Sequence, residues 1–450
     1  MRKITTLPSQ TVLHIFLVLL IFQGWCTNAL AQPLSGILPK YDRYVDGANV
    51  TLSWNSLSGA TDYTIELAQN TDFTLNYFTS GAITETSWQT TLSSTGVWYW
   101  RVIESNGTSN TISGINKFRY VKPNDINGNT LWLKADSSVV LSGSSLVQWN
   151  DISGNNHSFV QSTPADQPLI TNAGSILNNK PVVRFDGVSD FLNGGNILNI
   201  GTNSQTTFIV ARGTGVYYGK FGNSAAPFNI YSCYNIGGEQ GVEFAGLAYQ
   251  NFATTNSTTY HLLNFRADRT AGTGRMYRNL NQVAEANLTG VTTGYNMTTT
   301  NPLLIGRYTL SGTPFFTNGD IAEVIFFNTA LNDSLRGVVG NYLSDKYAPP
   351  INLGRDSIVI SGFCPITLNA PSGYTNLLWS TGSNSASINV NTSGAYWLSG
   401  TNLFGQISVD TILITHPAIP SPTNTGICAG QSNTWNADMG PGFTYVWSNG

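Results

Sequence analysis

The chain has 450 residues, a formal net charge of −3, and charged side chains at only 10% of positions. So little basic charge provides no surface for nucleic acid, and aromatic residues at 12% argue against disorder of the whole chain. The length suits roughly three domains of ordinary size. Three cysteines, Cys233, Cys364 and Cys428, follow the N-terminal apolar segment, which excludes a disulfide-dense scaffold.

The N-terminus predicts a secretory signal peptide over residues 1–31. Arg2 and Lys3 precede an apolar run at residues 14–22, and small residues follow at 29–31. The run is shorter than the ~20 apolar residues of a membrane helix. Cys26 follows a bulky tryptophan, which argues against lipid attachment there. We therefore expect an exported protein, secreted or held at the cell surface.

Residues 40–122 predict a small antiparallel β-sandwich. Apolar residues alternate with polar ones in three segments, which indicates strands with one buried face. The segments contain Val50, Leu52 and Trp54, then Tyr63, Ile65 and Leu67, then Trp98, Trp100 and Val102. Together they resemble a fibronectin type III domain of bacterial extracellular proteins.

Residues 124–349 predict a larger sandwich of the jelly-roll kind. Strand-like segments separated by Asn/Gly turns run through it, and one amphipathic helix is expected at residues 331–347. The helix should be capped by Asn332 or Asp333 and should bury Leu331, Leu335, Val338, Tyr342 and Leu343. The segments that carry a resemblance to concanavalin A-like or laminin-G-like domains are residues 131–136, 183–187 and 319–328, with the helix after them.

Residues 354–416 and 418–450 show an internal repeat. Cys364 and Trp379-Ser380 in the first copy recur as Cys428 and Trp447-Ser448 in the second. The copies resemble immunoglobulin-like or PKD-like repeats of bacterial surface proteins. The second copy stops at Gly450 without its later strands, so we expect a truncated product of a longer chain. A bridge between Cys364 and Cys428 is one open alternative.

The sequence shows no catalytic constellation, and no enzyme activity is expected of the residues present. The nearest acidic pair, Glu239 and Glu243, would lie roughly 13 Å apart along a strand, too far for a glycosidase pair. His157, His261 and His416 are scattered, which makes zinc chemistry unexpected.

Two groups of residues are candidate ligand sites. Asp186 and Asp190 flank a tight turn and could supply oxygen ligands to calcium, although the same turn could serve only to reverse the chain. Tyr217, Tyr218 and Phe221 lie in a Gly-rich stretch, residues 213–222, that could form a rim loop on which sugar rings stack. Core packing is the alternative for these rings.

Asp320 and Glu323 belong to the last strand segment of the resemblance. Glu323 is in phase with Ile321 and Ile325, and we expect a buried hydrogen bond to hold it.

The expected fold class is all-β, with several β-sandwiches. The expected function is extracellular adhesion or recognition, with the jelly roll binding a glycan or a protein surface and the flanking modules acting as spacers. Two alternatives are a secreted polysaccharide-degrading enzyme whose catalytic domain lies beyond Gly450, and a purely structural stalk. The identity of the ligand and the oligomeric state do not follow from the sequence.

Overall fold

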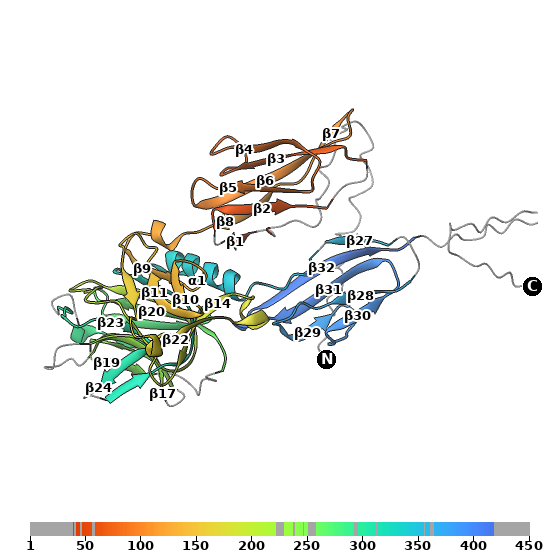
Figure 1. The fold of residues 1–450 in the computed structure, drawn as a ribbon. Coiled ribbons are helices and arrows are strands. Elements are labelled where there is room, and N and C mark those ends of the chain that lie inside the picture. The colour runs from red at the N-terminus through yellow and green to blue at the C-terminus, as the bar shows by residue number, and fades with distance from the viewer. Residues whose placement is uncertain are drawn as a thin grey trace, which may run out of the picture.

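The computed structural model describes residues 39, 42–45, 47–55, 59–221, 229–236, 239–245, 247–250, 258–291, 296–310, 313–354, 356–360 and 364–417. The predicted signal peptide, Cys26, Cys428 and the predicted second repeat lie outside these residues. The predicted all-β, multi-domain fold class is confirmed: Figure 1 shows three bodies built of strands. Among the described residues, no helix is long and apolar enough to span a membrane.

The first body contains one larger sheet and a separate strand pair. The larger sheet has the order β1-β8-β6-β3-β4 with β7 beside β6, and β2 pairs with β5. The alternating residues of the three predicted strands are buried in one cluster around Trp98 and Trp100, as expected. The strands are β1 (Arg43–Val45), β2 (Asn49–Ser53), β3 (Asp62–Ala68), β4 (Phe78–Ile83), β5 (Ser87–Thr91), β6 (Gly96–Ser105), β7 (Asn110–Ile112) and β8 (Asn116–Tyr120).

The second body is a large sandwich organised around β16 (Gln205–Phe221), which pairs with β17, β20, β23 and β26. One core cluster fills the space between its sheets, and a second lies between the sheet and the helix. The other strands are β9 (Asn129–Lys134), β10 (Val139–Ser142), β11 (Ser145–Asn150), β12 (Ser158–Val160), β13 (Leu169–Asn172), β14 (Pro181–Asp186), β15 (Leu192–Asn193), β17 (Asn229–Ile236), β18 (Glu239–Phe244), β19 (Leu247–Gln250), β20 (His261–Asp268), β21 (Thr273–Arg278), β22 (Asn281–Asn287), β23 (Leu303–Ile305), β24 (Arg307–Leu310), β25 (Thr313–Phe316) and β26 (Asn318–Phe327).

The predicted helix is present as α1 (Asp333–Tyr347), and Asn332 caps it by accepting a hydrogen bond from the Leu335 N–H at 2.9 Å. The predicted buried stripe is partly wrong. Leu335 is 38% exposed, and Val339 rather than Val338 faces the core. The buried face repeats at spacings of three and four through Val339, Tyr342, Leu343 and Tyr347, because the two tyrosines pack onto the sheet.

A β-bulge in β26 changes the face on which Glu323 lies. Val210 pairs with Glu323 whereas Ala211 pairs with Ile321, so Ala322 is an extra residue on β26. The expectation that Glu323 shares a face with both isoleucines is therefore wrong. Ile321 packs between the sheets, whereas Ile325 packs on the helix side.

The third body has a four-stranded sheet, β27-β32-β31-β29, and a pair, β28-β30, around the fully buried Trp379. Cys364 is exposed at its start. The strands are β27 (Ser357–Val359), β28 (Ile366–Asn369), β29 (Thr375–Trp379), β30 (Ser387–Val390), β31 (Gly394–Thr401) and β32 (Ile407–Thr415).

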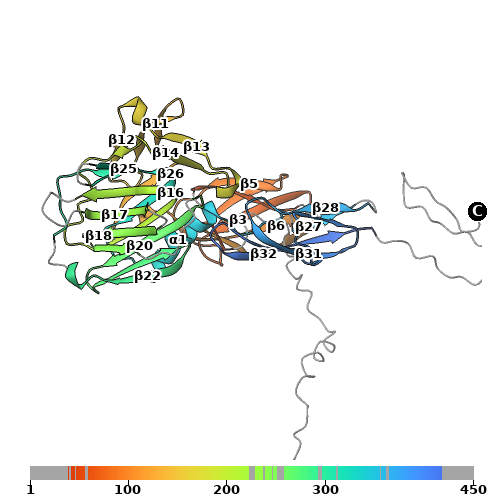
Figure 2. The same cartoon turned by 90° about the horizontal axis from the view of Figure 1, so that it is seen from below.

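Both smaller bodies contact the C-terminal half of α1. Figure 2 shows α1 on the side of the large sandwich next to them. From the first body, the Tyr44 N–H donates to Asp345 Oδ2 at 3.0 Å. From the third, Phe404 is only 2% exposed and lies in the core cluster between sheet and helix, and the Asn402 side chain donates to the Ala348 carbonyl. The helix is thus shared by the three bodies.

Candidate functional site

Three charged side chains form a row across neighbouring strands of the large sandwich. Arg184 on β14 pairs with Asp320 on β26, and Asp320 pairs in turn with Arg212 on β16. Residues opposite one another in antiparallel strands project on the same face with their side chains adjacent. The sheet register therefore places two guanidinium groups on either side of one carboxylate, and we call Arg184, Asp320 and Arg212 the arginine row.

Hydrogen bonds hold the arginine row in place. Arg184 binds Asp320 through two nitrogens, with Nε at 2.7 Å from Oδ1 and Nη2 at 3.1 Å from Oδ2. Arg212 Nε and Nη2 each lie 2.7 Å from Oδ2, and the Tyr260 hydroxyl donates to the same oxygen at 2.6 Å. The Arg212 guanidinium also lies 4.6 Å from the centre of the Tyr260 ring, a cation–π distance. Both arginines are therefore fixed.

The arginine row carries one excess positive charge, because two guanidinium groups face one carboxylate. Burial by itself raises the pKa of Asp320, but hydrogen bonds from Arg184 and Tyr260 and the charges of both arginines outweigh it and hold that pKa below its usual value. Asp320 is therefore ionised at neutral pH. Its side chain is 1% exposed, whereas those of Arg184 and Arg212 are 45% and 28% exposed.

A cleft of about 480 Å³ opens over the arginine row. Its other polar side chains are Thr214, Thr258 and Asn318, and Asn318 pairs with Thr214 in the row of residues beside the arginines. Glycine is required where β16 pairs with β26 beneath the cleft. A Cβ on Gly213 would lie 2.2 Å from the Asn318 carbonyl oxygen, and Gly213 has a φ of +114°. The cleft thus presents hydroxyl, amide and guanidinium groups to a ligand.

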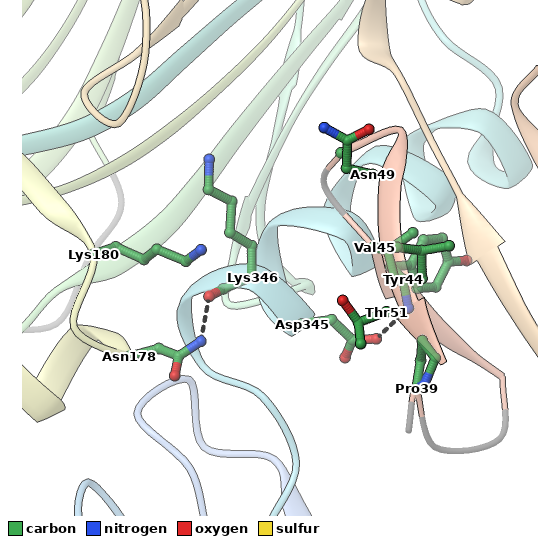
Figure 3. Close-up of a pocket in the computed structure, with 11 residues that line it drawn as sticks. Pro39, Tyr44, Val45, Asn49, Thr51, Asn178, Lys180, Asp345 and Lys346 are labelled. Carbon is green, nitrogen blue, oxygen red and sulfur yellow. Dashed lines mark hydrogen bonds between the residues drawn. The ribbon is translucent and has the colours of Figure 1, made fainter. Parts of the chain in front are cut away.

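A second hollow, of about 320 Å³, lies where the first body meets α1 (Figure 3). Its polar groups already contact one another: Tyr44 binds Asp345, and the Asn178 side chain donates to the Lys346 carbonyl at 2.9 Å. Burial raises the pKa of Asp345, and this effect outweighs the hydrogen bond from the Tyr44 N–H and the charge of Arg43, which both lower the pKa. This hollow is therefore the interface between two docked bodies.

The prediction that Tyr217 and Tyr218 lie on an exposed rim loop is wrong. Both are in the interior of β16, at 0% and 2% exposure, because the strand continues through its glycines, which allow close approach of a neighbouring backbone instead of forming a turn. Tyr218 shares a hydrogen bond with the Thr207 hydroxyl at 2.8 Å. Neither ring is available for a sugar, and core packing, the alternative, explains both.

Phe221 is only half-buried and lies edge-on to Tyr308, with ring centres 4.7 Å apart. The ring of Tyr308 in turn lies near that of the exposed Phe315, with ring centres 6.1 Å apart. These three rings form a separate aromatic group on β16, β24 and β25. A role for Phe221 in sugar binding stays a prediction.

Asp186 and Asp190 lie together in the predicted turn. Oδ1 of Asp186 accepts from the N–H groups of Val188, Ser189 and Asp190, and Asp190 Oδ2 accepts from the Asp186 N–H. Burial and the charge of Asp186 raise the pKa of Asp190 to about 6. The described residues contain no group of three or more metal-ligating side chains. The carboxylates thus serve the turn, and calcium binding here stays a prediction.

The buried hydrogen bond expected for Glu323 is confirmed. Oε1 accepts from Trp132 Nε1 at 2.6 Å and from the Tyr342 hydroxyl at 3.0 Å. Oε2 accepts from Lys346 Nζ and the Tyr347 hydroxyl, each at 2.8 Å. Glu323 is therefore an anchor for α1. The other acidic pair considered, Glu239 and Glu243, lies along one strand, β18, as expected.

Sequence reasoning singled out Asp320 but missed both of its arginine partners. A signal was present: Arg184 interrupts the apolar run Val182-Val183-Arg184-Phe185, and a lone charge in such a run calls for a partner. The identity of the partner depends on the strand register, which the sequence does not show.

No family model and no curated protein matches the chain. Among solved structures, a Trypanosoma rangeli sialidase in complex with sialic acid matches at 13% identity and a TM-score of 0.35, over 69% of this chain and 56% of the sialidase. A botulinum neurotoxin serotype D/C binding domain matches at 12% identity and a TM-score of 0.34, over 62% of this chain and 72% of the domain. The CBM40 of Ruminococcus gnavus IT-sialidase, bound to sialyllactose, matches at 14% identity and a TM-score of 0.29, over 37% of this chain and all of the module. The chain thus spans just over half the length of the sialidase.

Proposed function

We propose that the chain is an extracellular recognition protein that binds a glycan in the cleft over the arginine row. The observation that carries this proposal is the row itself. Two partly exposed guanidinium groups are fixed by a buried carboxylate and surrounded by hydroxyl and amide side chains. Hydroxyl-rich ligands need many fixed hydrogen-bond partners, and this cleft supplies them.

The modules on either side have a positioning role in this proposal. By resemblance, the first body would be a fibronectin III-like spacer and the third an immunoglobulin- or PKD-like repeat. Their contacts with α1 through Tyr44 and Phe404 favour a fixed arrangement of the modules over modules joined only by flexible linkers. Residues 1–31 would direct export, and the modules described would bind rather than catalyse.

An array of neutral and acidic glycans, probed with the full chain, tests the proposal. We expect retention of at least one glycan class and its loss in the double variant Arg184→Gln/Arg212→Gln. The matched control is Arg275→Gln, which removes an arginine that pairs with Glu285 at 3.0 Å on strands away from the cleft. Absence of any retained glycan, with calcium and with a chelator, would contradict the proposal. A glycan retained equally by the double variant would place binding elsewhere.

A further inference from the structure

The hydrogen-bonding capacity of Arg184 is only partly used. A guanidinium group has five N–H donors, and Arg184 directs its Nε–Nη2 edge at Asp320. No described residue accepts a hydrogen bond from its Nη1. The side chain is 45% exposed at the cleft. A second acceptor can therefore reach the free edge without disturbing the first.

The charge balance of the cleft favours an anion at that edge. Near neutral pH arginine stays protonated and Asp320 stays ionised, so the excess positive charge is not lost by titration of either group. Asp186, the next acid on the same face of β14, directs Oδ1 at the N–H groups of its own turn. A ligand that brings one negative charge would balance the arginine row.

The shape of the donors favours a carboxylate among monoanions. A planar guanidinium edge binds the two oxygens of a carboxylate side by side. A cleft of about 480 Å³ is within the range that holds a small ligand, and its Thr and Asn side chains suit ring hydroxyls. We infer that the arginine row binds the carboxylate of an acidic sugar, with Arg184 as its principal contact. This inference rests on the glycan recognition proposed above and adds the class of ligand.

The test compares each acidic sugar with a matched neutral one by isothermal titration calorimetry on the full chain. The first pair is trigalacturonic acid and its methyl ester, which keeps the ring hydroxyls and removes the charge. The second pair is sialyllactose and lactose. We expect one acid to bind about tenfold to a hundredfold more tightly than its neutral partner, with affinity falling as salt is raised.

Variants of Arg184 separate a direct contact from general charge. Arg184→Gln should abolish the preference for the acid, while Arg184→Lys, which keeps the charge and loses the planar edge, should recover only part of it. Arg275→Gln should leave the preference unchanged. Circular dichroism should show each variant folded, since Arg212 and Tyr260 still bind Asp320.

Three results would overturn the inference. Equal binding of acid and neutral partner in both pairs would refute the role of the carboxylate while leaving glycan recognition intact. Tighter binding of a sulfated lactose than of either acid would assign the arginine row to another anion. An acid preference that survives Arg184→Gln would place the anion elsewhere. Absence of binding by every sugar would count against the proposed function itself.

Discussion

Replacement of Glu323 by glutamine should loosen α1 far more than any surface substitution. Glu323 and Lys346 form an ion pair at 2.8 Å, with side chains 0% and 1% exposed. Glutamine keeps an oxygen for Trp132 and Tyr342 but turns an amide group toward the Lys346 ammonium. Removal of one partner from such a pair destabilises by about 3–5 kcal/mol. Asp136, at 2.9 Å from Lys346, limits the loss toward the lower value.

Hydrogen–deuterium exchange of the peptide that spans α1 measures this loss locally. A change of about 3–5 kcal/mol in the opening free energy corresponds to exchange faster by roughly a hundredfold to a few thousandfold. The control is Glu285→Gln, which removes the exposed partner of Arg275 and should leave exchange in α1 unchanged. A less than tenfold effect of Glu323→Gln would refute the assignment of Glu323 as the anchor.

The double variant Glu323→Gln/Lys346→Met tests whether the two charges act as a pair. With the ammonium gone, the glutamine amide no longer faces a cation and can donate to the Tyr347 hydroxyl. The opening free energy of α1 should therefore fall less in the double variant than the sum of the two single-variant losses, and the difference should be about 1–3 kcal/mol. Strict additivity would show that the two side chains stabilise α1 independently.

Three further predictions concern single side chains. Burial, and then the charge of Arg278, lowers the pKa of His261 to about 4 from 6.5. Between pH 6.5 and 4 the histidine is therefore protonated in the unfolded chain but still neutral in the folded chain, so the free energy of unfolding should fall by up to about 3 kcal/mol over this range. In urea denaturation, His261→Gln should reduce this dependence of stability on pH. Because the pKa of Asp190 is raised to about 6, its contribution to stability is present at low pH and is lost as the pH rises through 6. Asp190→Asn should raise the Tm at pH 8 and leave it nearly unchanged at pH 4, and equal shifts would contradict the raised pKa. Phe404→Ala should weaken docking of the third body by about 3–5 kcal/mol and enlarge the radius of gyration in small-angle scattering, and an unchanged radius would argue against docking through this side chain.

Local periodicity predicted much of the fold because it reports directly on burial. The alternation around Trp54 and Trp100 identified residues that are buried in the first body. The helix was predicted with two candidate caps, Asn332 and Asp333, of which Asn332 is the cap, because capping depends on neighbouring residues alone. These features need no knowledge of distant contacts.

The errors arose where glycine and tertiary contacts decide the structure. The glycines before Tyr217 suggested a loop, yet Gly213 and Gly215 belong to the 17-residue strand β16 and permit close approach of the backbone at residues 316–319. The arginine row was out of reach for another reason. Arg184 and Arg212 are 136 and 108 residues from Asp320 in sequence, and only the strand register joins them.

The bulge at Ala322 links the helix anchor to the candidate site. In a regular strand, side chains three residues apart point to opposite faces, so Asp320 and Glu323 would lie on different sides of the sheet. The extra residue turns both carboxylates to the helix side, where one binds α1 and the other binds the two arginines. Deletion of Ala322 would leave Asp320 and Glu323 two residues apart in a regular strand, so both carboxylates should stay on the helix side. Because each carboxylate has its own donors, we expect exchange in α1 and the pairing of Asp320 with Arg184 both to persist in this variant. Loss of both together would mean that the arginine row depends on the helix, and the cleft would then be part of the same cooperative unit.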